Sequence, residues 1–171
     1  IHDCEDEKVL KFLVKNNDWI NKKNSKDFVE TLWECCQIPD FSKKAYGNHI
    51  EIVKKVFEFL SSKSGKVTNE YMKKQLEYLD RYDGNIDTLT NRISNVRTWS
   101  YVANKKDWIE NADYWVQLTK SIEDALSDRL HEELTKSFID KKISILSISL
   151  KQDLVLNTKI NNENKIHIDD Q

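Results

Sequence analysis

The sequence is poor in the residues that interrupt helices. It has only three Gly and one Pro in 171 residues, and turn-rich β architectures use more of both. No apolar run reaches the roughly 18 residues that a membrane span requires, and no signal-peptide pattern opens the chain. These absences favour helices joined by short connections. We therefore predict an all-α protein without a membrane-spanning segment.

A large net charge and a cysteine framework are also missing. The 27 basic and 29 acidic residues leave a net charge of -2, so any nucleic-acid contact has to be local. The three cysteines are odd in number and form no CxxC motif, which favours a reducing, cytoplasmic location. The chain can bury one core of ordinary size. Its start at Ile1 and its end at Gln171 indicate a fragment of a longer protein.

Apolar residues recur at helical spacing along most of the chain. The pattern predicts helices over residues 5–15, 26–37, 48–60, 68–79 and 86–103, and a long helix from residue 112. The expected N-caps are Ser25, Asn48 (with Glu51 completing a capping box), Thr68 and Asn111. Pro39, Gly65 and Gly84 are expected to end helices. The predicted core consists of Trp33, Phe57, Leu89, Ile93, Val96, Trp99, Trp115, Ile122, Leu126 and Leu130.

The C-terminal region has a mixed pattern. From Leu118 to Phe138 the apolar residues step by four, a spacing that rotates about 40° per step and so forms no heptad seam. Residues 143–150 fit a helix or a strand, and residues 154–168 look like two short strands around an Asn-rich turn. We therefore predict one helical domain over residues 1–150, ending in a long helix. A short strand-like or disordered tail, residues 151–171, is expected to follow.

No catalytic or metal-binding motif is apparent. Ser64-Gly65-Lys66 is the nearest match to a phosphate-binding loop, but Leu60 stands at its first Gly position and Val67 at its hydroxyl position. Its simpler interpretation is the C-cap of a helix. The His and Cys spacings fit no zinc site. We therefore assign no catalytic residue, no metal and no cofactor to this chain.

Residues 92–115 combine aromatic and basic side chains. Trp99, Tyr101, Trp108, Tyr114 and Trp115 interleave with Arg92, Arg97, Lys105 and Lys106. This mixture can stack bases and hold phosphates, although tryptophans between two amphipathic helices more often pack in the core. The candidate RNA contacts are Arg92, Arg97, Lys105, Lys106 and Tyr101. In the alternative interpretation, Arg92 and Arg97 pair with acids such as Asp87 or Asp128 and fasten helices together.

Three segments carry a resemblance to a known family. They are LWECCQIPDF at 32–41, GNIDTLTNRISNVRTWSYVANKKDW at 84–108 and IEDALSDRLHEELTKSFIDKK at 122–142. Together they resemble the bacterial branch of the mitochondrial degradosome RNA helicase family, ATP-dependent enzymes of superfamily two. The resemblance covers residues 28–150 and implies an accessory domain that follows two motor domains. It also implies one helix from residue 112 to about 150.

The resemblance implies a non-catalytic domain that supports RNA engagement or motor-domain packing. Its implied partners are RNA, bound weakly, and the motor domains of the same chain, which would hold ATP and magnesium upstream of Ile1. A ribonuclease is a further candidate partner, and no membrane is expected. Relatives often carry Arg-Pro where this chain has Lys105-Lys106, so the charge is kept and the rigid turn is lost. A helical protein-interaction module and a helical enzyme with an unrecognised site are the alternatives.

Overall fold

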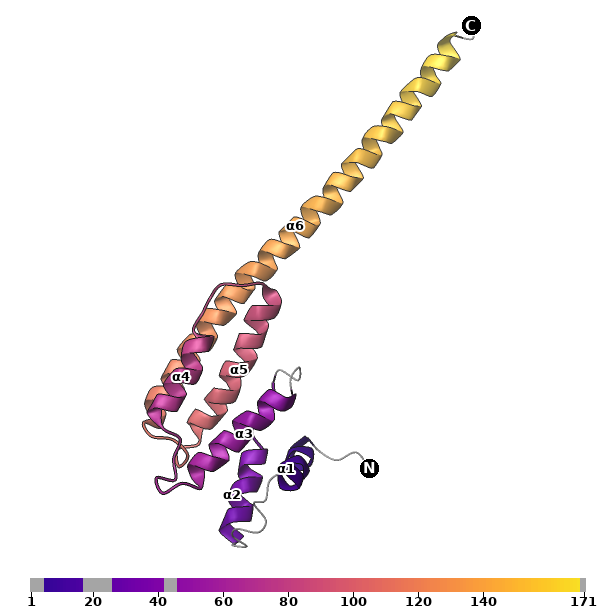
Figure 1. Cartoon of the computed structure of the whole chain (residues 1–171). Helices are drawn as coiled ribbons and strands as arrows, with labels where there is room; N and C mark the ends of the chain where they lie inside the picture. Colours follow the sequence, from indigo (N-terminus) through magenta and orange to yellow (C-terminus); the bar gives the residue numbers. More distant parts are fainter. Residues whose placement is uncertain (1–4, 17–25, 42–45, 170–171) are drawn as a thin grey trace. The chain divides into compact units, whose positions relative to one another are not determined.

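The computed structural model describes residues 5–16, 26–41 and 46–169, and all regular elements in these ranges are helices (Figure 1). They are α1 (Glu5–Asn16), α2 (Lys26–Cys36), α3 (Tyr46–Leu60), α4 (Asn69–Leu79), α5 (Ile86–Asn104) and α6 (Ala112–Asp169). Within these ranges the only β-type pairing is an isolated parallel bridge between Val67 and Ile109. The predicted all-α class is confirmed. None of the described helices combines the length and apolar character needed to cross a membrane.

The chain divides into two units, Ile1–Arg129 and Leu130–Gln171. The first unit contains α1 to α5 and the start of α6, and the second contains the rest of α6. The division falls within one continuous helix, which also passes the predicted boundary at residue 150 without a break. Residues 143–150, whose apolar pattern fits either a helix or a strand, are helical.

The prediction of a strand-like tail is wrong for the described residues, because residues 151–169 are helical. The Thr158 hydroxyl donates to the carbonyl of Leu154 at 2.8 Å, a bond typical of a helix interior. A hairpin with no further strand is marginal in water. Extending an existing helix instead adds one hydrogen bond per residue without a new nucleation step.

The first three helices pack through aliphatic, aromatic and thiol side chains. Phe28 on α2 meets Phe57 on α3 edge-on, with 5.1 Å between the ring centroids. Cys35 and Cys36 are buried in this core. Burial, followed by the nearby charge of Asp6, raises the pKa of the Cys36 thiol to about 12. Burial likewise raises the pKa of Cys35 well above its ordinary value.

Aromatic rings join α3 to α4 and α4 to α5. Tyr71 on α4 lies 5.0 Å from the Phe59 ring of α3 and 5.7 Å from the Trp99 ring of α5. A further contact links α5 to the α2–α3 connection: the buried Thr98 hydroxyl donates to the Pro39 carbonyl at 3.1 Å. A threonine can be buried once its hydroxyl has an acceptor.

Eight of the ten predicted core residues are buried, and Trp33 and Leu130 are the exceptions. Trp33 lies on α2 and is half-buried. Leu130 is half-buried at the boundary between the two units.

Two predicted helix boundaries need correction. Helix α3 begins at Tyr46, so Asn48 lies inside it and does not form a capping box with Glu51. The same helix ends at Leu60, and Gly65 lies in a later turn with φ of 64°. Glycine suits that turn because side chains strain a left-handed backbone. Ser25 lies outside the described residues.

Other caps follow the sequence closely. Thr68 caps α4, since its hydroxyl oxygen accepts from the amide of Tyr71 at 3.3 Å, as predicted. Asn85 caps α5 by accepting from the amide of Thr88 at 2.9 Å. Both side chains satisfy amides that lack a partner within the helix.

The depth of burial along α6 generates a prediction. Leu126 is fully buried and Leu134 is 47% exposed, so the same substitution tests both environments on one helix. Leu126→Ala should lower the free energy of unfolding by about 2–5 kcal/mol, because it removes buried methyl groups and leaves a cavity. Leu134→Ala should lower it by less than about 1 kcal/mol. Urea denaturation followed by circular dichroism measures both, and similar losses would show that the buried face is wrongly identified.

Candidate nucleic-acid interface

Two connections that are distant in sequence lie against each other. The α3–α4 connection meets the α5–α6 connection where the Val67 amide donates to the Trp108 carbonyl at 2.7 Å. Val67 and its bridge partner Ile109 are both buried. Beside them the Asn69 side-chain amide donates to the Glu110 carboxylate at 3.3 Å. We call this contact the loop junction.

The start of α6 is fastened to the same place. The Trp115 indole N–H donates to the Asn69 side-chain oxygen at 2.8 Å. Asn111, the predicted N-cap, directly precedes the helix and has φ of 53°, a left-handed conformation that asparagine tolerates better than most residues. Its carbonyl accepts from the amide of Trp115 at 3.2 Å. The first turn of α6 is therefore held against the N-terminal end of α4.

The tryptophans of residues 92–115 are core residues. Trp99, Trp108 and Trp115 are at most 6% exposed, which confirms their interpretation as packing residues. The aromatic rings of this segment that are more accessible are those of tyrosines. Tyr101 is half-buried, and Tyr114 is 58% exposed at the start of α6.

Arg92 is held within the first unit. One guanidinium nitrogen donates to the carbonyl of Arg81 at 2.8 Å and also to the carbonyl of Asp83. A second guanidinium nitrogen lies 3.7 Å from the Asp83 carboxylate. The side chain is only 15% exposed, so Arg92 ties α5 back to the α4–α5 connection.

Arg97 also joins two elements. Its Nε donates to the Glu123 carboxylate on α6 at 2.7 Å, and the arginine side chain is 51% exposed. We named Asp87 and Asp128 as examples of pairing acids, whereas the observed partners are Asp83 for Arg92 and Glu123 for Arg97. The fastening role suggested for the two arginines describes their contacts better than a shared RNA surface does.

The two lysines have different surroundings. Lys105 follows the last residue of α5, and its ammonium lies 5.4 Å from the Tyr101 ring centroid and 5.6 Å from that of Trp108. Lys106 is exposed. In the described part of the chain, neither lysine has a carboxylate within ion-pair distance. Both ammonium groups can therefore meet an incoming anion.

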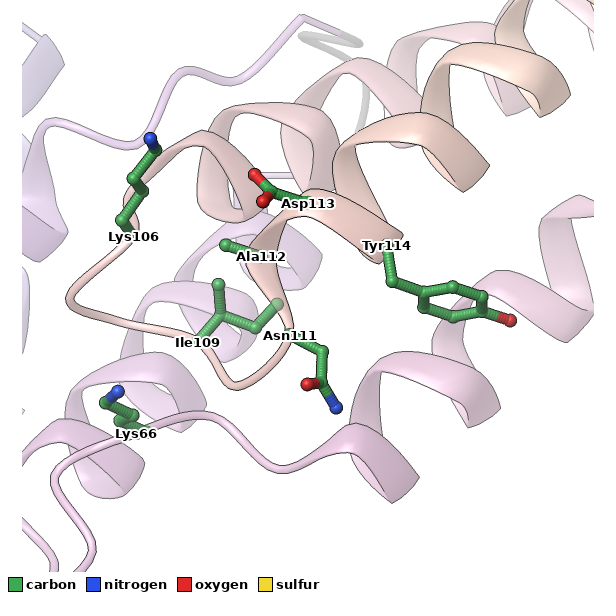
Figure 2. Close-up of a pocket in the computed structure, with 7 residues that line it drawn as sticks. All are labelled: Lys66, Lys106, Ile109, Asn111, Ala112, Asp113 and Tyr114. Carbon is green, nitrogen blue, oxygen red and sulfur yellow. The ribbon is translucent and has the colours of Figure 1, made fainter.

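Lys106 shares a pocket with a lysine that we had not selected. The pocket has a volume of about 580 Å³ and lies at the loop junction. It is lined by Lys66, Lys106, Ile109, Asn111, Ala112, Asp113 and Tyr114. Figure 2 shows the two lysines on one side of this pocket and Tyr114 on the other. The first turn of α6, which also favours an anion, contributes to the lining.

The charges of this pocket favour an anion only moderately, since Asp113 opposes the two lysines. A second pocket of about 370 Å³ lies among α3, α4 and α5 and includes Glu51, Lys55 and Tyr71. Burial, followed by the charges of Glu51 and Glu58, raises the pKa of Tyr71 to about 12. Carboxylates close to this second pocket disfavour phosphate there. The pocket at the loop junction is therefore the better candidate.

Sequence reasoning missed Lys66 and gave Tyr114 no role as a contact. Lys66 is forty positions from Lys106 in sequence, and it was considered only within the failed phosphate-binding motif. No local pattern signals that the two connections meet. In the described residues, no group of three or more His, Cys, Asp or Glu side chains is placed to hold a metal ion.

Comparison with known protein families, curated proteins and solved structures gave no match. The helicase resemblance of residues 28–150 therefore stays a prediction.

The arginine contacts generate a prediction. Arg92→Ala should lower the free energy of unfolding by about 1–3 kcal/mol, because it leaves two backbone carbonyls without their charged donor. Arg97→Ala removes a half-exposed ion pair and should cost at most about 1 kcal/mol. Thermal denaturation of both variants beside the unaltered chain measures the difference. Equal losses, or a larger loss for Arg97→Ala, would contradict the role given to Arg92.

Proposed function

We propose that this chain is a non-catalytic helical accessory domain of a cytoplasmic ATP-dependent RNA helicase, and that it contacts the RNA backbone at the loop junction. One observation carries the proposal. Lys66 and Lys106 line one pocket, and Lys105 stands beside Lys106 with its ammonium over the rings of Tyr101 and Trp108. Three cations thus gather at the surface of a chain whose net charge is slightly negative.

The chemistry suits a weak, sequence-independent contact. Lysine ammonium groups bind phosphate as point charges and carry no sequence information. The exposed ring of Tyr114, at the edge of the same pocket, is available to stack on a base, as aromatic side chains do in single-strand binding. Arg92 and Arg97 do not take part in this RNA contact, because both already bind other parts of the first unit.

The helicase assignment rests on the resemblance of residues 28–150. Under this proposal ATP and magnesium are held by motor domains outside this chain, and the accessory domain acts by positioning RNA or packing against those motors. A ribonuclease remains a candidate partner of the whole enzyme.

A helical protein-interaction module is the second candidate. It is favoured by the exposed apolar side chains of the second unit, which include Phe138, Ile145 and Leu154. An apolar surface of this kind often marks a binding site for another protein. This role concerns the second unit, whereas the RNA contact concerns the first.

The RNA contact is tested with a matched pair of charge removals. Lys66→Ala/Lys106→Ala should weaken binding of a single-stranded RNA. It should also make the slope of log K against log salt concentration shallower by about 1.4, since each phosphate contact contributes roughly 0.7 to this slope. The control Lys73→Ala/Lys74→Ala removes two exposed lysines of α4 and should change binding little. Fluorescence anisotropy at several salt concentrations measures both, and melting temperatures should stay unchanged. Equal weakening by the two pairs would show diffuse attraction and reject the junction as the site.

A further inference from the structure

The second unit carries a narrow apolar seam along α6 that is exposed to solvent. From Leu118 to Phe138 the apolar residues of α6 recur every four residues. From Ile139 onward a second set recurs at intervals of four, three and four residues. The residues concerned are Ile139, Ile143, Leu146 and Leu150, each between 49% and 62% exposed. On a helix with 100° per residue, these four side chains fall within an arc of about 60°. Alternation of three and four is the heptad spacing of a helix that packs along another helix.

The spacing of this seam is symmetrical along the chain. Read from either end, it is four, three and four. A helix laid antiparallel on a copy of itself therefore places Ile139 opposite Leu150 and Ile143 opposite Leu146. Each of the four layers is then apolar on both sides. A two-fold axis generates this kind of contact, in which residue i meets residue j and residue j meets residue i.

The charges next to the seam select the direction of pairing. Lys136 lies three residues before Ile139, and Asp153 lies three residues after Leu150, so both continue the heptad positions. In the antiparallel arrangement Lys136 of each copy faces Asp153 of the other. A parallel, in-register pair would instead oppose lysine with lysine and aspartate with aspartate, which is unfavourable.

We infer that residues 136–153 of α6 form an antiparallel two-helix contact with a second copy of this chain. The contact has four apolar layers closed at each end by an ion pair. Because the seam is short, the dimer is weak and its population depends on protein concentration. The inference does not rest on RNA binding, which concerns the other unit.

Four other apolar residues of α6 provide a control surface. Leu134, Ile145, Ile148 and Val155 are also exposed, but helical geometry places them on the opposite side of α6 from the seam. They stay outside the contact. Substitution on this side alters the same helix without touching the paired layers.

Sedimentation velocity of the full 171-residue chain, over roughly a hundredfold range of concentration, tests the dimer. The unaltered chain should shift from monomer to dimer as concentration rises. Ile143→Asp should leave a monomer throughout, because it places a charge in two central layers. Ile148→Asp, the matched control on the opposite side, should keep the dimer. Loss of the dimer in both variants would reject the seam.

Charge exchange tests the direction. Lys136→Glu and Asp153→Lys each place like charges at both ends of the antiparallel contact, and each should weaken the dimer about tenfold. An equimolar mixture of the two variants should recover the affinity, because every end layer then pairs opposite charges. A dimer of unchanged affinity in Lys136→Glu would overturn the antiparallel arrangement. A chain that remains monomeric at every concentration would overturn the inference and leave the seam to a different protein or to another part of a longer chain.

Discussion

The hydrogen bond between the Val67 amide and the Trp108 carbonyl holds the surface of the first unit in place. It joins the connection between α3 and α4 to the connection between α5 and α6. Burial of Val67 and Ile109 around it shields the bond from competition by solvent. The Trp115–Asn69 bond holds the first turn of α6 at the same place, and the Val67–Trp108 pairing brings together the connections that carry Lys66 and Lys106. Without it, the cations would belong to two independent loops.

The buried tryptophans make the same junction rigid. Trp108 lies between the backbone pairing and the Lys105 ammonium, and Trp115 anchors α6 through its indole N–H. Large aromatic side chains contribute much packing area at a small cost in conformational entropy. The aromatic richness of residues 92–115 is thus explained mainly by architecture. The packing of these rings stabilises the backbone segments that carry the charged side chains of the loop junction.

Much of the fold could be predicted because helical spacing is a local property. The repeats around Leu89 and Ile93 identify α5, and the hydroxyl of Thr68 marks the start of α4. The meeting of Lys66 with Lys106 could not be predicted, because it depends on tertiary packing of segments forty residues apart. The partners of Arg92 and Arg97 were missed for the same reason. The alternation at residues 154–168 was misleading because a short apolar run fits a strand or a helix until its neighbours are known.

The two adjacent thiols of α2 can report local opening of the core of the first unit. Cys35 and Cys36 are at most 1% exposed, and burial keeps them protonated far above neutral pH. Alkylating reagents attack the thiolate and need access to the sulfur. Modification therefore requires that α2 first separates from its neighbours, and its rate reports how often this part of the core opens. The rate of thiol modification is therefore a chemical probe of local unfolding in α2, a helix well away from the loop junction in sequence.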